Sequence, residues 1–189
     1  MGVPLLAHRL ASFTLAVALV LAVAPAHAAS KHGSSGQGTG ALYGFAAGAM
    51  LPQGDFADTN ATSYFVQSRS IYVEKVFGGR AAAYYGDTAG ANGSDGGRVY
   101  GFDFDVLLKF GSADTFGYVY GGVGYGSLTF TYPGAVPGTT VRHGGYDWCW
   151  TGGIGLTIKR GFYLEAGYVS YQTDPVAANF IPVVIGFQF

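Results

Sequence analysis

The segment YGFDFDVLLKF, residues 100 to 110, alternates between apolar and other side chains along its whole length. Alternation with a period of two is typical of a β-strand that has one apolar and one polar face. Asp103, Asp105 and Lys109 share the face opposite the aromatic residues. The segment therefore predicts a two-faced strand, and the pattern alone leaves open which face meets water.

Strands account for the rest of the chain from residue 41 onward, because no segment there has a convincing helical period. The apolar alternation and the turn residues that interrupt it predict eight strands, over residues 41–51, 64–77, 80–86, 98–110, 116–131, 146–158, 162–171 and 180–189.

The connections between these strands alternate in length. Long polar stretches cover residues 52–62, 87–97, 133–145 and 173–179, whereas the linkers at Gly78-Gly79, 111–115 and 159–161 are short. An up-and-down antiparallel barrel places every second connection at the same end. Barrels of the bacterial outer membrane show this asymmetry, with long extracellular loops and short periplasmic turns.

Composition decides which face of the strands meets the surroundings. Only 11% of the residues are charged, against roughly 25% in soluble domains, so the chain lacks the charges for the exterior of a soluble barrel such as a lipocalin. The apolar face is therefore expected to meet lipid. Asp103, Asp105, Lys109 and Glu165 are expected to form a charge network in the lumen, since buried charges require partners. The sequence predicts an all-β, eight-stranded antiparallel up-and-down transmembrane β-barrel.

The N-terminal residues have the pattern of a secretory signal peptide. Arg9 precedes an apolar run from Ala11 to Ala24, and Ala26-His27-Ala28 is a small-x-small cleavage site. The run is shorter than the roughly 20 residues that a membrane-spanning helix needs. We therefore predict a signal peptide over residues 1–28, a flexible Gly/Ser-rich leader over 29–40 and an outer-membrane barrel over 41–189. Cys149 is the only cysteine, which excludes an internal disulfide.

Four segments resemble the outer-membrane β-barrel-domain family, the small eight-stranded barrels of the OmpA/OmpX type. They are GFAAGAMLPQGDF, YVYGGVGYG, FYLEAGYVSY and the C-terminal FIPVVIGFQF. The resemblance implies export to the outer membrane of a Gram-negative cell, with membrane lipid and lipopolysaccharide as partners. It also implies that Phe187 and Phe189 form the signal read by the barrel-assembly machinery.

Candidate chemistry is sparse in this sequence. GGVGYG, residues 121 to 126, lies within a predicted strand and lacks the following helix of a dinucleotide site. His143, Asp147 and Ser127 could be arranged as a hydrolytic set, but a loop position is favoured for His143. Asp103, Asp105 and Glu165 favour a structural lumen network over a catalytic one. We predict no enzyme activity, catalytic residue, metal or cofactor, and the formal net charge of −1 argues against nucleic acid as a partner.

The resulting functional hypothesis is a structural or surface-interaction role, such as adhesion or host contact, through the extracellular loops. The first alternative is a narrow passage for small or hydrophobic molecules, as in OmpW-like barrels. A lipid A-modifying enzyme is the third possibility.

Overall fold

A computed structural model describes residues 41–91, 96–112, 114–133, 139–159, 161–173 and 177–189. The predicted signal peptide and leader lie outside these residues. Helices long and apolar enough to cross a membrane do not occur in the described part of the chain.

Strands form where the sequence alternates, and they extend further than the pattern predicts. The elements are β1 (Leu42–Gln53), α2 (Asp55–Thr59), β2 (Asn60–Ala61), β3 (Ser63–Glu74), β4 (Phe77–Gly90), β5 (Gly97–Gly111), β6 (Phe116–Pro133), β7 (Thr140–Ile158), β8 (Phe162–Tyr171) and β9 (Ala178–Gln188).

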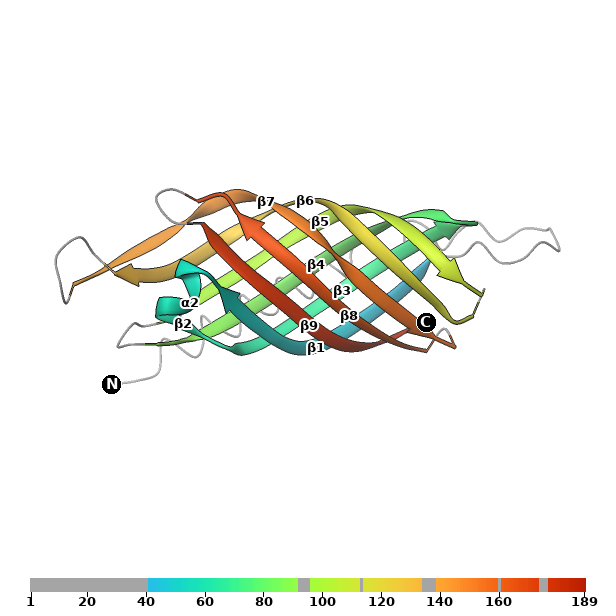
Figure 1. Ribbon diagram of the computed structural model, residues 1–189, viewed down its shortest axis with the longest axis horizontal. Coiled ribbons are helices and arrows are strands. Elements are labelled where there is room, and N and C mark those ends of the chain that lie inside the picture. Colours follow the sequence, from blue (N-terminus) through green and yellow to red (C-terminus); the bar gives the residue numbers. More distant parts are fainter. Residues whose placement is uncertain (1–40, 92–95, 113, 134–138, 160, 174–176) are drawn as a thin grey trace. The chain divides into compact units, whose positions relative to one another are not determined.

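The eight long strands of the described residues close on themselves. Each of them pairs antiparallel with the next along the chain, β4 pairs with β5, and β1 pairs with β9 to complete the ring. Figure 1 shows the tilted strands of this barrel, with the short helix α2 and the two-residue strand β2 at one end. The structure confirms the predicted eight-stranded, up-and-down antiparallel barrel.

The two ends of the barrel differ as the connection lengths predict, but one short turn lies at a different position. The predicted linker at Gly78-Gly79 is wrong, because both glycines pair with β3 inside β4. The chain turns instead at Lys75 and Val76, and Lys75 has φ 57°. The β5–β6 turn is closed by a hydrogen bond from Ser112 N to Thr115 O.

The long connections contain more regular structure than predicted. The stretch over 52–62 holds α2 and β2, which lie at the same end as the other long connections, and β2 pairs with the end of β4. Residues 140–145, predicted as loop, belong to β7 and pair with β6. His143 is therefore a strand residue, whereas a loop position was predicted.

The faces of the strands follow the predicted assignment. On β5, Phe104 and Val106 are 61% and 65% exposed, whereas Asp103 and Asp105 are 4% and 6% exposed. The same alternation runs along β7, where Trp150 is exposed and Cys149 is buried. Apolar side chains thus cover the outside of the barrel, and the buried side chains fill its interior.

The interior has two hydrophobic clusters. The larger one includes Met50, Phe65, Tyr84, Phe130 and Phe180 and lies toward the long-loop end. The smaller one is formed by Ile71, Leu107, Phe116 and Tyr118, toward the short-turn end. Phe56 of α2 belongs to the larger cluster, its ring 5.3 Å from that of Phe130. The charged side chains of the lumen lie beside both clusters. Arg80 pairs with Ile71 of the smaller one, and Glu165 is two residues from Tyr163 of the larger one on the same face of β8.

Candidate functional site: the charged layer inside the barrel

Arg80 of β4 is the centre of a buried charged cluster. Its Nη1 lies 2.6 Å from Asp103 Oδ1 and 2.5 Å from Asp105 Oδ2, both on the paired strand β5. Its Nε lies 3.2 Å from Glu165 Oε1 on β8, across the barrel. One guanidinium therefore links three carboxylates from two strands, using the several donors that arginine presents in a fixed plane.

Arg69 of β3 supplies a second cation to the same cluster. It forms an ion pair with Glu165, donates to the Tyr118 hydroxyl, and donates from Nη2 to Gln188 Oε1 at 2.6 Å. Its guanidinium carbon also lies 3.3 Å from the centroid of the Tyr163 ring, a cation–π contact. Glu165 thus lies between two guanidiniums and joins the contributions of β3, β4 and β8.

Neutral side chains complete the hydrogen bonding of the carboxylates. Tyr118 donates its hydroxyl to Glu165 Oε1 at 2.6 Å, and the Gln67 side chain donates to Glu165 Oε2. Thr151 of β7 donates to Asp105 Oδ1. The charged layer is therefore connected to β3, β4, β5, β6, β7 and β8, which makes it a cross-link through the lumen.

All five charged side chains of this cluster are removed from water. Arg69, Arg80, Asp103, Asp105 and Glu165 are between 2% and 6% exposed. Ions buried in this way are tolerated only when they are paired and hydrogen-bonded. The arrangement holds strands together, and each carboxylate is engaged by arginine, so the geometry offers no free carboxylate pair for acid–base chemistry.

The structure brings Asp103, Asp105 and Glu165 together and leaves Lys109 apart. The Lys109 ammonium lies 4.7 Å from the centroid of the Phe116 ring, near the short-turn end. The sequence reasoning missed both cations of the cluster. Arg69 stands on the same face of β3 as Phe65 and Ile71, a signal that alternation could have given. Arg80 is the first residue of its predicted strand, directly after the predicted Gly78-Gly79 linker, and the prediction gave it no role in the lumen.

The hydrolytic set considered for the long-loop end is not assembled. His143 Nε2 and Asp147 Oδ2 are 3.7 Å apart on β7. Ser127 of β6 pairs with Tyr146, whose side chain faces outward, whereas Asp147 pairs with the neighbouring Gly126. Alternation therefore places Ser127 on the opposite face of the wall from His143 and Asp147. Within the described residues, no group of three His, Cys, Asp or Glu side chains could hold a metal ion.

The outer surface has two kinds of region, one with large hydrophobic side chains and one with small side chains. Large exposed residues are continuous over β5, β7 and β8, where Phe104, Trp150 and Phe162 are about 60% exposed. The outward positions in the middle of β3 and β4 are small, among them Ser68 and Ala81. An apolar band around a closed barrel is the exterior that hydrocarbon requires, because closure leaves no unpaired strand edge within that band.

Comparison with solved structures gives the same architecture. The outer membrane enzyme PagL superposes with a TM-score of 0.53 at 12% identity, covering 79% of this chain and 99% of PagL. Neisserial surface protein A superposes with a TM-score of 0.51 at 11% identity, over 78% of this chain and 94% of that one.

The outer membrane protein Ail of Yersinia pestis, solved in a phospholipid nanodisc, gives a TM-score of 0.50 at 12% identity, over 79% and 100% of the two chains. The chain has the fold of the small outer-membrane β-barrels. This fold and the apolar exterior support a location in the bacterial outer membrane. No family model and no curated sequence matches the chain.

Proposed function

We propose that this barrel is a surface-contact protein, and that the β6–β7 hairpin is its contact element. β6 pairs with β5 only as far as Thr129, and β7 pairs with β8 only from Cys149 onward. The pairing between β6 and β7 continues beyond these points, and its last pair is Pro133 with Thr140. Figure 1 shows β6 and β7 extending beyond the other strands at the end that holds α2.

The extended hairpin has covered side chains on β6 and an open main-chain edge on β7. Phe130 and Thr131 on β6 are 1% and 5% exposed, and Phe130 packs against Phe56 of α2. On β7, no strand of the described chain pairs with residues 140–147 on the side away from β6, and the edge ends at Trp148, whose carbonyl accepts a hydrogen bond from Gln172 N at 3.5 Å. An unpaired strand edge outside the membrane is a template for adding a strand from another chain. This open edge is the observation that carries the proposal.

The charge at the same end indicates the class of partner. Four described acidic residues lie there, Asp55, Asp58, Asp87 and Asp147, against two arginines, Arg98 and Arg142. Complementary charge favours correct encounters and suppresses wrong ones. A neutral or basic extended protein segment is therefore the expected partner, and a polyanion is disfavoured.

Hairpin truncation tests the proposal. Residues 131–142 are replaced by Asn-Gly, a two-residue hairpin turn, and both forms are displayed on a Gram-negative strain that lacks its own adhesins. Adhesion is measured on immobilised extracellular-matrix proteins, with heparin as the polyanionic surface. We expect adhesion to at least one protein surface to exceed that to heparin and to be lost on truncation.

Val141→Thr, which leaves the main-chain edge intact, is the matched control and should adhere like the natural chain. Equal adhesion of the truncated and natural chains, or adhesion to heparin alone, contradicts the proposal.

The proposal also assigns no enzyme activity, and unchanged lipid A mass spectra from cells with and without the protein are the expected result. The filled lumen of the described residues supports the expectation of no steady single-channel conductance.

Assembly is a second part of the proposal. Phe187 and Phe189 are 52% and 66% exposed on the outside of the last strand, and Phe189 exchanges main-chain hydrogen bonds with Tyr43. We propose that these two aromatics form the signal for the barrel-assembly machinery. Deleting Phe189 should reduce heat-modifiable barrel in the outer membrane, and an unchanged yield would contradict this role.

A further inference from the structure

The open edge of β7 has a gap in its row of outward side chains. The row includes Tyr146 and Trp148, which are 62% and 66% exposed. Gly144 stands in the same row between Arg142 and Tyr146. A Cβ added to Gly144 would have Thr129 Oγ1, 3.5 Å away, as its nearest neighbour, which is an ordinary contact. Neither crowding nor a positive φ therefore requires glycine at this position.

The inner face of the same edge is occupied. His143 Nε2 and Asp147 Oδ2 lie 3.8 Å and 3.9 Å from the place of a Cβ on Gly145, and 3.7 Å from each other. These two side chains thus fill the space above Gly145. A strand added to this edge finds more room for a large side chain opposite Gly144 than opposite Gly145.

The main chain presents its hydrogen-bonding groups at the residues of the outward row. Gln172 N donates to Trp148 O at 3.5 Å, so Trp148 directs its carbonyl to the side of β8. In an antiparallel ladder, every second residue points its N–H and C=O to the same side. Gly144 and Tyr146 therefore offer theirs to an incoming strand, and the residue opposite Gly144 exchanges both hydrogen bonds with it.

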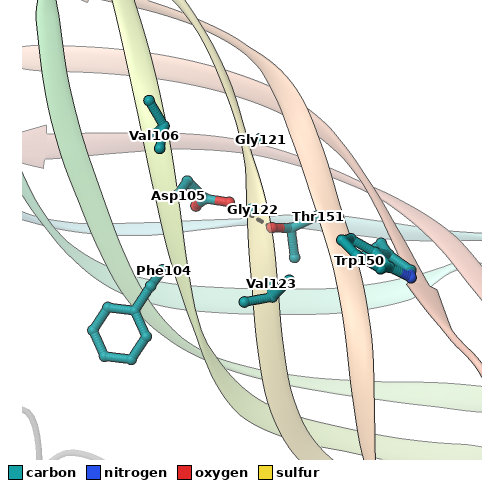
Figure 2. Close-up of a pocket in the computed structure, with 8 residues that line it drawn as sticks. All are labelled: Phe104, Asp105, Val106, Gly121, Gly122, Val123, Trp150 and Thr151. Carbon is teal, nitrogen blue, oxygen red and sulfur yellow. Dashed lines mark hydrogen bonds between the residues drawn. The ribbon is translucent and has the colours of Figure 1, made fainter.

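The wall below the hairpin is closed at both edges of β7. Trp150 and Thr151 pair with β6 on one side and with β8 on the other. Figure 2 shows this level of the barrel, where Thr151 is hydrogen-bonded to Asp105 and the Trp150 ring points away from both. Addition of a strand to β7 is therefore confined to residues 140–147.

The neighbours of Gly144 favour an aromatic ring in the gap. The Tyr146 ring stacks on Tyr125 with centroids 6.1 Å apart, and its hydroxyl lies 3.2 Å from that of Tyr100. These contacts hold the ring toward β6 and β5, so it leaves the open side of Gly144 uncovered. The exposed Arg142 flanks the gap on the other side, and a guanidinium can contact the face of a ring. Aromatic residues opposite edge glycines stabilise strand pairing.

We propose that the open edge binds a strand of a partner protein that carries an aromatic residue opposite Gly144 and a basic residue opposite Asp147. This inference rests on the proposed contact role of the hairpin and names the sequence class of its partner. The partner strand runs antiparallel to β7, so its basic residue precedes the aromatic one by three positions. The ring lies over the Gly144 main chain, and the basic side chain pairs with Asp147 on the inner face.

Labelled octapeptides measure this preference on the purified barrel in detergent micelles. The probe Lys-Thr-Ser-Tyr-Ser-Thr-Ser-Thr places its Lys opposite Asp147 and its Tyr opposite Gly144, and fluorescence polarisation gives the Kd. Replacing the Tyr of the probe by Ala should weaken binding about tenfold, since ring contacts are lost. Replacing its Lys by Thr should weaken binding about threefold.

N-methylation of the probe separates main-chain pairing from contacts of the ring. A methyl group on the Tyr nitrogen removes a donor aimed at Gly144 O and should abolish binding. The nitrogen of the following Ser points away from β7, so methylating it should leave the Kd within about twofold.

Substitution of Gly144 tests the gap from the side of the barrel. Gly144→Val fills it and should weaken the Tyr probe about tenfold, to the level of the Ala probe. Gly145→Ala is the matched control on the inner face and should leave the Kd of the Tyr probe unchanged. Heat-modifiable migration shows that each variant is folded, and Gly144→Ala should give an intermediate Kd if the valine variant folds poorly.

Three results would overturn the proposal. They are equal affinity for the Tyr and Ala probes, equal tolerance of the two N-methyl groups, and a dimer of the natural chain that Gly144→Val converts to a monomer. The last would assign the edge to a second copy of the chain.

The hairpin truncation separates this inference from the proposed function. The truncated barrel keeps Gly144 but loses Arg142 and the main-chain pairs around it, so it should bind the Tyr probe about tenfold more weakly. Loss of matrix adhesion on truncation, together with equal affinity for the Tyr and Ala probes, would overturn the partner's sequence class alone. Unchanged matrix adhesion and an unchanged Kd for the truncated barrel would overturn both proposals.

Discussion

The two faces of β5 differ sharply in their surroundings. On the outer face the hydrophobic side chains from Phe102 to Phe110 are 41% to 65% exposed, whereas on the inner face Asp103 and Asp105 are 4% and 6% exposed. The outer face needs only an apolar medium. The inner face needs specific partners, because its charges are buried without bulk water.

This difference indicates that the inside of the barrel tolerates fewer substitutions than the outside. A lipid-facing side chain can be exchanged for another apolar one with little effect, since hydrocarbon contacts either. A lumen side chain has specific partners, as Arg80 forms ion pairs with Asp103, Asp105 and Glu165. Substitutions on the two faces should therefore fail for different reasons and by different amounts.

The largest effect is expected for Arg80→Met, which leaves three buried carboxylates with one remaining guanidinium. Removing one partner of a buried ion pair costs about 3 to 5 kcal/mol, and urea unfolding of the barrel in bilayers measures it. Adding Asp103→Asn and Asp105→Asn to the same variant should recover most of the loss, because Glu165 keeps Arg69. A loss equal in the single and triple variants would show that charge pairing is not the cause.

On the outer face, Phe104→Arg places a charge among lipid chains near the middle of the strand. The expected cost is about 2 to 4 kcal/mol at the bilayer midplane, seen as reduced insertion yield and reduced stability in the same unfolding assay. Phe104→Leu should behave like the natural chain. Normal insertion of the arginine variant would mean that this face does not meet hydrocarbon.

A smaller effect separates two adjacent glycines. A Cβ at Gly122 would lie 2.7 Å from Asp105 Cα on the inner face, so Gly122→Ala should destabilise the barrel by about 1 to 3 kcal/mol. Gly121→Ala faces outward into open space and should leave stability unchanged or raise it by about 0.5 kcal/mol. The midpoint of urea unfolding distinguishes them, and equal losses would remove the distinction between the faces at this site.

The smallest effect is expected for Lys109→Gln, because Lys109 lies over Phe116 and outside the charged cluster. Its loss should change the free energy of unfolding by no more than about 0.5 kcal/mol, as for most surface substitutions. A loss as large as that of Arg80→Met would place Lys109 in the network after all.

The sequence predicted the repeating features well and the irregular ones poorly. β8 was predicted with the bounds that it has, because its alternation is uninterrupted and turn residues flank it. Gly78 and Gly79 misled the prediction, since glycine within a strand and glycine in a turn look alike in a single sequence. The turn at Lys75 carries no such mark, because Lys75 adopts the positive φ in place of glycine.

The residues of the candidate site also divide into predictable and unpredictable ones. Its acidic members are Asp103, Asp105 and Glu165. They were visible in the sequence because each is a charged residue that alternates with large apolar residues along its strand. Their cationic partners were not, because pairing across the lumen depends on which strands face each other and at what height. Arg69 of β3 meets Glu165 of β8, which is 96 residues away along the chain.

By itself, the sequence determined the period of the strands, the alternation of long and short connections and the apolar exterior. These features are local or compositional, and they hold for any register of the barrel. The tertiary structure decided the partners of the lumen charges and the open edge of β7. Each of these depends on the register between strands, and a shift of one residue would exchange the inner and outer faces of the wall.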